Sequence, residues 1–225
     1  MLYKKNNKNI YDYFSYKARQ QGFVARSIFK LQEINSNFSI IAKDDVVLDL
    51  GCAPGSWIQY VEKIITYGYG KLVAIDLLPI KILLGSKTIF LQKNIFKLNS
   101  EEIQKILINF GSNRISSFNV ILSDMADNIT GIKDVDQYNN MRICFKVLSL
   151  SNSLLKVGGH MCVKIFACNM LNKFINICKK YFVYIKLKRT KCTRSRSREF
   201  YLIAMEKKDN ENYLDDNFIN YFYTK

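Results

Sequence analysis

A lysine lies inside an otherwise apolar segment in the second half of the chain. Residues 161–166 read MCVKIF, and Lys164 is the one charged residue among them. A buried ammonium group is costly unless an opposite charge pairs with it or it loses its proton. Two interpretations follow. Either Lys164 forms a structural ion pair at a strand end, or desolvation lowers its pKa enough for it to act as a general base.

A carboxylate ends another apolar segment. Residues 119–125 read NVILSDM, which places Asp124 near the carboxyl end of a predicted strand. Ligands bind at this edge of open α/β sheets. If the strands that carry Asp124 and Lys164 are neighbours, the two side chains lie close together.

The clearest motif covers residues 49–57, which read DLGCAPGSW between an apolar run and a helical pattern. Glycines such as Gly51 and Gly55 let the backbone approach a ligand. The helix N-terminus supplies unpaired N–H groups, and Pro54 suits the first helical turn. The G-x-x-x-G spacing differs from the dinucleotide fingerprint, and no GK[ST] follows. The pattern looks like the S-adenosylmethionine loop of class I methyltransferases, whose cationic cofactor suits a nearby acid.

A second acidic residue, Asp76, ends the next apolar run. A carboxylate at this position can accept hydrogen bonds from both ribose hydroxyls of a nucleoside cofactor. The alternative is a helix N-cap or a turn residue.

The chain that must position these residues alternates short β-branched runs with longer helical patterns. This alternation predicts an α/β fold in which helices cover both faces of a parallel sheet. Nearly unbroken apolar runs are typical of buried parallel strands, and the short link between the last two runs predicts an antiparallel hairpin. We expect strands at 46–52, 71–78, 88–94, 119–125, 160–166, 182–187 and 200–205, and helices at 55–66, 100–109, 134–156 and 170–180.

The chain is strongly basic, because 34 Lys and Arg residues against 19 Asp and Glu give a formal net charge of +15. Such an excess indicates an acidic partner, of which nucleic acid is the commonest, or it serves solubility alone. Two basic clusters stand out, one in a predicted helical segment at 15–34 and one before the last strand. The residues expected to contact RNA phosphates are Lys17, Arg19, Arg26, Arg194, Arg196 and Arg198.

Cysteine and histidine usage excludes several kinds of site. The six cysteines form no C-x-x-C pair, and they read as reduced thiols of an intracellular protein. The single histidine, His160, excludes a metal site with two histidines and a Ser-His-Asp triad elsewhere. It opens a predicted strand, where a structural role is favoured. We expect no metal.

The organisation of the chain predicts one domain over 1–225, with a basic helical segment at 1–40 and an acidic, aromatic tail at 209–225. The N-terminus lacks the apolar region of a secretory signal, and no apolar run reaches the length of a membrane span. We therefore expect an intracellular monomer that is neither secreted nor bound to membrane. An organelle, mitochondria included, and the cytoplasm or nucleus stay open as its location.

Six segments in this order resemble the FtsJ/RrmJ family of ribosomal RNA large-subunit ribose 2′-O-methyltransferases. The resemblance runs from about residue 16 to residue 207, and it implies a Rossmann-like class I fold. That fold has a seven-stranded, mostly parallel sheet with one antiparallel strand. The segments read ARSIFKLQEI, VVLDLGCAPGSW, AIDLLPI, ILSDMADNITG, GGHMCVKIF and SRSREFYLIA.

The resemblance also implies which residues act. The family's catalytic tetrad, Lys-Asp-Lys-Glu, falls by motif on Lys30, Asp124, Lys164 and Glu199. The cofactor, S-adenosyl-L-methionine, would be bound by Gly51, Pro54, Gly55, Trp57, Asp76, Asn94 and Asp124.

Two positions depart from the family pattern. Asn94 stands where the family usually has an aspartate that binds the adenine amino group, and its amide oxygen can still accept that hydrogen bond. Asp127 replaces the proline of D-M-A-P-N, which alters the loop beside the substrate.

The predicted activity is therefore 2′-O-ribose methylation of ribosomal RNA, on a uridine of the large subunit, with Lys164 as the general base. The partner is free ribosomal RNA or the assembled large subunit. A tRNA or mRNA-cap methyltransferase is the nearest alternative. A ribosome-assembly factor that binds RNA without catalysis and a dinucleotide oxidoreductase are the others. The phrases DLLP, SDMA and SRSREFY favour the ribosomal branch.

Overall fold

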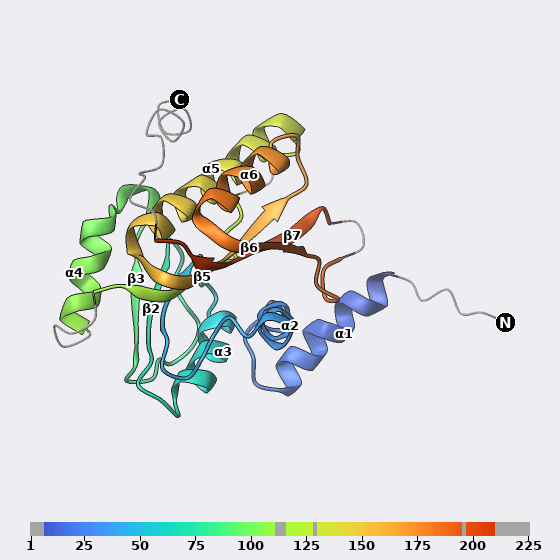
Figure 1. The fold of residues 1–225 in the computed structure, drawn as a ribbon. Coiled ribbons are helices and arrows are strands. Elements are labelled where there is room, and N and C mark those ends of the chain that lie inside the picture. The colour runs from blue at the N-terminus through green and yellow to red at the C-terminus, as the bar shows by residue number, and fades with distance from the viewer. Residues whose placement is uncertain (1–6, 111–115, 128–129, 195–196, 210–225) are drawn as a thin grey trace.

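The computed structural model describes residues 7–110, 116–127, 130–194 and 197–209. Its strands form one sheet in the order β3-β2-β1-β4-β5-β7-β6 (Figure 1). The bounds are β1 (Val46–Leu50), β2 (Lys71–Asp76), β3 (Thr88–Gln92), β4 (Phe118–Ser123), β5 (Leu155–Phe166), β6 (Phe182–Lys188) and β7 (Glu199–Lys207).

The direction of the strands matches the predicted fold class. Pairs β1–β2, β2–β3, β1–β4 and β4–β5 are parallel. Strand β7 is antiparallel to both β5 and β6, so it is the one reversed strand of the sheet. The predicted hairpin of the last two strands is thereby confirmed.

Helices cover both faces of the sheet (Figure 1). Val46, Leu48 and Leu50 of β1 enter one buried cluster and Val47 the opposite one, as the two-residue period of a strand requires. Burying each such side chain contributes about 1.5–3 kcal/mol. One face carries α4 (Ser100–Phe110), α5 (Lys133–Leu154) and α6 (Leu171–Tyr181); the other carries α1 (Asn7–Gln20), α2 (Ile28–Phe38) and α3 (Ser56–Ile65).

The N-terminal segment differs from the prediction. We expected one helical stretch over 15–34, but the chain turns between α1 and α2. Gly22 adopts a φ of +73°, and the amide of Phe23 donates to the carbonyl of Ala18 at 2.9 Å. This is the hydrogen bond of a Schellman C-cap, for which glycine is the favoured residue. The turn lets α1 fold back against α2.

His160 does not open a strand, because β5 begins five residues earlier, at Leu155. Its Nδ1 accepts a hydrogen bond from the amide of Glu206 at 3.2 Å. Burial lowers the pKa of this imidazole. The predicted structural role of His160 agrees with this contact.

The strand order reverses between β1 and β4. Strands β2 and β3 lie on one side of β1, and β4 to β7 lie on its other side. Ligands of open α/β sheets bind at such a switch point, outside the carboxyl ends of the strands. Within the described ranges, no helix has both the length and the hydropathy needed to cross a bilayer. The same residues contain no cluster of three potential metal ligands.

Candidate active site

Four charged side chains meet at the carboxyl edge of the sheet. Lys30 Nζ lies 2.6 Å from Glu199 Oε1. Lys164 Nζ lies 3.4 Å from Asp124 Oδ1 and 3.4 Å from Glu199 Oε2. We call Lys30, Asp124, Lys164 and Glu199 the charged quartet. Its two ammonium and two carboxylate groups balance, which is what permits them to be mostly buried together.

Strand register brings three members of the charged quartet together. Strands β4 and β5 are neighbours, as the prediction required, and Asp124 directly follows the end of β4. In the β5–β7 pair, Lys164 lies opposite Tyr201 and Phe166 opposite Glu199. Lys164 and Glu199 therefore point to the same face of the sheet. That face is the one covered by α2, which supplies Lys30.

Neighbouring groups fix the orientation of the two carboxylates. The hydroxyl of Tyr201 donates to Asp124 Oδ1 at 2.5 Å, and the hydroxyl of Thr193 donates to Glu199 Oε1 at 3.1 Å. Lys30 Nζ lies 5.4 Å from the centre of the Tyr201 ring. Burial, followed by the charges of Asp124 and Glu199, raises the pKa of the Tyr201 phenol well above its usual range. Tyr201 therefore remains a hydrogen-bond donor at neutral pH.

The charge state of Lys164 differs from the first expectation. Burial alone pushes its pKa down, as predicted. The carboxylates of Asp124 and Glu199 together outweigh burial, so the pKa of Lys164 is raised above its ordinary value. With nothing bound, Lys164 is an ammonium group, and it must lose a proton before it can serve as a base.

This charge state predicts a rising pH profile for any reaction in which Lys164 accepts a proton. Because its pKa lies above neutral pH, raising the pH increases the small neutral fraction. Single-turnover rates at saturating substrates should increase about tenfold per pH unit between about pH 6.5 and 8.5. A rate that is flat or falls over this interval, in protein that stays folded by circular dichroism, contradicts the assignment.

The glycine loop after β1 is packed so closely against neighbouring residues that two of its positions have no room for a side chain. Gly51 has a φ of +77°, and a Cβ there would lie 2.2 Å from Met125 Cγ. Gly55, which caps α3 at a φ of +118°, would place a Cβ 2.8 Å from Ile82 Cδ1. Met125 follows Asp124, so the loop packs directly beside the charged quartet.

The other predicted cofactor residues have partners of their own. The two carboxylate oxygens of Asp76 accept hydrogen bonds from the amides of Ala53 and Leu78, each at 2.8 Å. Asn94 Oδ1 caps a single 3-10 turn, η1 (Ile95–Lys97), through the amide of Phe96 at 2.9 Å. A carboxylate or amide oxygen can accept a second hydrogen bond, so these contacts are compatible with the cofactor roles, which remain predictions.

Trp57 is buried and contacts the start of α2. Its side chain is 2% exposed, and its indole N–H donates to the carbonyl of Ser27 at 2.9 Å. Its ring lies 5.8 Å from that of Tyr201. These contacts join the start of α3 to the start of α2, so Trp57 holds Lys30 and the loop in one arrangement.

Asp49 is a site residue that the sequence reading missed. It is fully buried in β1, and neither carboxylate oxygen has a hydrogen-bond partner among the described residues. Burial, followed by the charges of Asp124 and Asp76, raises its pKa well above the usual range. Three carboxyl groups thus surround the loop, and one of them is unsatisfied. The same signal that singled out Lys164, a charge inside an apolar run, could have found Asp49.

This arrangement fits S-adenosyl-L-methionine. The cofactor carries a cationic sulfonium and an ammonium group, and the acids around the loop favour cations. The close packing of Met125 on Gly51 and of Ile82 on Gly55 requires that both loop positions be glycine, and a loop without side chains there leaves its backbone N–H groups within reach of a ligand. Asp76 keeps hydrogen-bonding capacity for ribose hydroxyls.

Five of the six basic residues predicted to bind RNA lie on α1, just before α2 and on the connection between β6 and β7. Arg19 is exposed on α1, while Lys17 places its Nζ 5.1 Å from the Phe29 ring. Arg26 donates to the carbonyl of Cys192 at 3.3 Å, which ties the start of α2 to the β6–β7 connection. Arg194 and Arg198 are exposed on that connection. Arg196 lies outside the described residues.

The chain is similar to proteins of known family. A family model described as FtsJ-like methyltransferase matches residues 23–207, a span that contains the charged quartet and the glycine loop. The chain belongs to the FtsJ-like methyltransferase family. It is therefore a methyltransferase, and the family expected from the sequence motifs is confirmed.

Named relatives cover nearly the whole chain. The ribosomal RNA large subunit methyltransferase E of Desulfatibacillum aliphaticivorans is 38% identical over 209 residues, which are 92% of this chain and 97% of the relative. The protein of the same name from Picrophilus torridus is 33% identical over 199 residues, 87% of this chain and 97% of the relative.

A solved structure shares the fold of this family member. The crystal structure of a ribosomal RNA methyltransferase from Plasmodium falciparum superposes with a TM-score of 0.72 at 24% identity. The superposition covers 82% of this chain and 98% of that one. The α/β fold predicted from the alternating pattern is confirmed, and so is the Rossmann-like fold that the family resemblance implied.

Proposed function

We propose that this methyltransferase transfers a methyl group from S-adenosyl-L-methionine to a ribose 2′-hydroxyl of ribosomal RNA, on a uridine of the large subunit. The observation that carries the proposal is the position of Lys164. Its ammonium nitrogen lies 3.4 Å from the carboxylates of both Asp124 and Glu199, beside the glycine loop. The names of the relatives support ribosomal RNA as the substrate class, and such a substrate implies an intracellular enzyme.

The chemistry divides between cofactor and protein. When bound, S-adenosyl-L-methionine supplies a methyl group on a cationic sulfonium, and this positive charge disfavours the ammonium form of Lys164. Neutral Lys164 accepts the proton of the 2′-hydroxyl as the ribose oxygen forms its bond to the methyl carbon. The carbon–sulfur bond would break in the same step, and the sulfur would leave as a neutral thioether with the electron pair of that bond. Asp124 and Glu199 then stabilise the ammonium that this transfer produces. Holding the two reactants in line supplies much of the rate acceleration.

Lys30 contributes through Glu199. Its 2.6 Å ion pair with Oε1 leaves Oε2 directed at Lys164, so Lys30 sets the position of that carboxylate. Tyr201 does the same for Asp124 through its hydroxyl. Lys30 and Tyr201 are positioning residues in this scheme.

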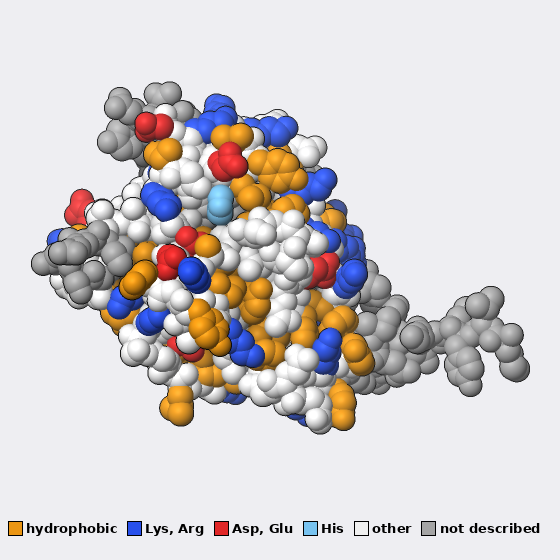
Figure 2. Space-filling view, turned by 60° about the horizontal axis from the view of Figure 1, so that its bottom comes forward, with side chains coloured by type: hydrophobic (Ala, Val, Ile, Leu, Met, Phe, Trp, Pro, Cys, Tyr) orange, Lys and Arg blue, Asp and Glu red, His pale blue; other side chains and the backbone are white. Residues whose placement is uncertain are grey.

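Surface charge supports a nucleic-acid substrate. On the face drawn in Figure 2, Lys and Arg side chains are scattered among exposed apolar ones, with acidic side chains at several places between them. The excess of basic residues is thus spread widely. Basic side chains that neutralise phosphates supply most of the affinity of RNA-binding proteins that lack base contacts.

The test is a survey of methyl acceptors. Labelled methyl transfer from S-adenosyl-L-methionine is measured on free ribosomal RNA, separated large subunits, tRNA and capped mRNA, and the modified nucleotide is then mapped. We expect label on the large subunit or its RNA. Label confined to tRNA or cap overturns the substrate class. The absence of transfer to all four RNAs, by protein that binds the cofactor, favours a ribosome-assembly factor instead.

A further inference from the structure

A small hollow lies between α1 and α2, outside the charged quartet. It has a volume of about 250 Å³ and is lined by Ser15, Ala18, Arg19, Phe23, Val24, Ala25 and Arg26. We call it the α1–α2 pocket. It is smaller than the pockets of about 300–1,000 Å³ that bind drug-sized molecules, so it admits one ring system.

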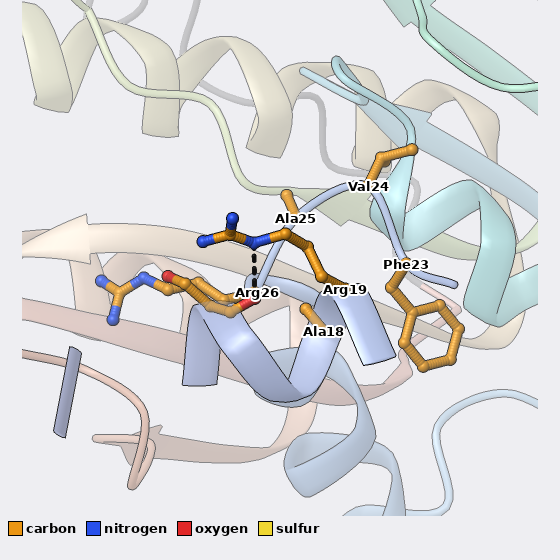
Figure 3. A pocket seen from close by; sticks show the side chains of 7 residues that line it. Ala18, Arg19, Phe23, Val24, Ala25 and Arg26 are labelled. Carbon is orange, nitrogen blue, oxygen red and sulfur yellow. Dashed lines mark hydrogen bonds between the residues drawn. The ribbon is translucent and has the colours of Figure 1, made fainter. Parts of the chain in front are cut away.

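The lining of the α1–α2 pocket combines two kinds of side chain. Four members are apolar, namely Ala18, Phe23, Val24 and Ala25. The two charged members are both arginines. Figure 3 shows the arginine side chains on one side of the view and Phe23 and Val24 on the other. None of the lining residues is acidic. A guanidinium plane stacks on nucleobases and also attracts phosphate.

The pocket is held open by contacts that do not involve a ligand. Gln59 of α3 accepts from the amide of Val24 at 3.0 Å and donates to the carbonyl of Gly22 at 3.0 Å. Both ends of one side-chain amide therefore fix the loop between α1 and α2. Arg19 Nε donates to the carbonyl of Ser15 at 3.5 Å. A preformed pocket of this kind spares the cost of ordering on binding.

The pocket lies next to the charged quartet in the chain. Arg26 lies just before α2, the helix that carries Lys30, and donates to the carbonyl of Cys192 at 3.3 Å. The next residue, Thr193, donates to Glu199 of the charged quartet at 3.1 Å. Only two hydrogen bonds and one peptide unit thus separate the Arg26 guanidinium from Glu199. We infer that a nucleotide close in sequence to the one at Lys164 reaches the pocket.

We propose that the α1–α2 pocket binds the unpaired base of a nucleotide that neighbours the methylated one, with Arg19 stacked on the base. The proposal rests on the proposed function, because it takes RNA as the substrate. It adds that the enzyme reads an unstacked, single-stranded segment. A base in a duplex is stacked and paired, so it cannot enter a pocket of this size.

The experiment compares equilibrium binding of two RNA strands by fluorescence anisotropy. One is a single strand of about 12 nucleotides, a length within the range that such proteins cover. The other is the same strand with abasic riboses at its central positions. Wild-type protein should bind the intact strand about tenfold more tightly, because base stacking on aromatic and guanidinium groups is lost from the abasic strand.

Three variants test whether this preference comes from the pocket. Ala25→Phe fills it, and Arg19→Ala removes the stacking group from an exposed position where folding is not at risk. Both should bind the two strands with equal affinity. Arg19→Lys keeps the charge without the planar group and should also lose the preference. Lys105→Ala, which removes an exposed charge on α4, is the matched control and should keep it.

Each other result overturns the proposal. It fails if wild-type protein binds both strands equally, or if Ala25→Phe and Arg19→Ala still prefer the intact strand. It also fails if Arg19→Lys still prefers the intact strand, since a positive charge alone would then suffice. The binding assay needs no methyl transfer. A protein that methylates RNA but ignores the missing bases defeats only this inference, whereas one that prefers intact bases but methylates nothing defeats only the proposed function.

Discussion

Replacing Lys164 with alanine is expected to reduce methyl transfer by about 10²–10⁴-fold, the contribution typical of a general base. The variant loses the only group of the charged quartet that lies 3.4 Å from both Asp124 and Glu199. Cofactor affinity should stay near that of the wild type, because the loop and Asp76 are unchanged. Single-turnover rates and calorimetric binding of S-adenosyl-L-methionine measure the two quantities separately.

Lys188→Ala provides the matched control for this variant. Lys188 lies on β6 and pairs with Glu33 at 3.0 Å, so its loss breaks an ion pair outside the charged quartet. Its methyl-transfer rate should remain within about twofold of the wild type, as expected for a partly exposed pair. Near-normal methylation by Lys164→Ala would remove the general base from the account.

Replacing Gly51 with alanine is expected to weaken cofactor binding. The residue has a left-handed φ of +77°, and its new Cβ would lie 2.2 Å from Met125 Cγ and 3.0 Å from the Met125 backbone. Backbone strain and overpacking each cost about 1–3 kcal/mol. We expect a fall in cofactor affinity of at least about tenfold and a lower thermal unfolding temperature, measured by calorimetry.

Gly22→Ala separates the clash from the strain. Gly22 has a similar φ of +73°, but a Cβ there meets nothing within 4 Å. This variant should lose about 1 kcal/mol of stability, the cost of a left-handed backbone, and keep its affinity for the cofactor. Equal cofactor affinities for Gly51→Ala and wild type would show that the loop does not form the cofactor site.

Much of the sheet and the core of the site could be predicted from the sequence. Buried parallel strands are nearly unbroken apolar runs, so a single charge within one stands out, as Lys164 does. Asp124 follows another such run at the edge where ligands bind. Placing the two together needed only that their strands be neighbours, which the β4–β5 pairing confirms.

Other features depend on distances that a sequence does not contain. The pKa of Lys164 was predicted to fall with burial, but Glu199 reaches it from an antiparallel strand and Asp124 from a parallel one, and together they reverse the shift. The break between α1 and α2 depends on the left-handed backbone of Gly22, which a helical pattern does not reveal. Asp49 was read as part of the loop motif, although its burial without a hydrogen-bond partner makes it part of the site.

The most direct test of the account is methyl transfer to an RNA whose mapped target nucleotide carries 2′-deoxyribose. In the proposed reaction the methyl group goes to the ribose 2′-oxygen, whose proton Lys164 takes. The deoxy RNA should therefore bind but receive no label. An RNA with the same base and an intact ribose should be methylated normally. Undiminished labelling of the deoxy substrate would place the methyl group on a base and contradict the proposed role of the charged quartet.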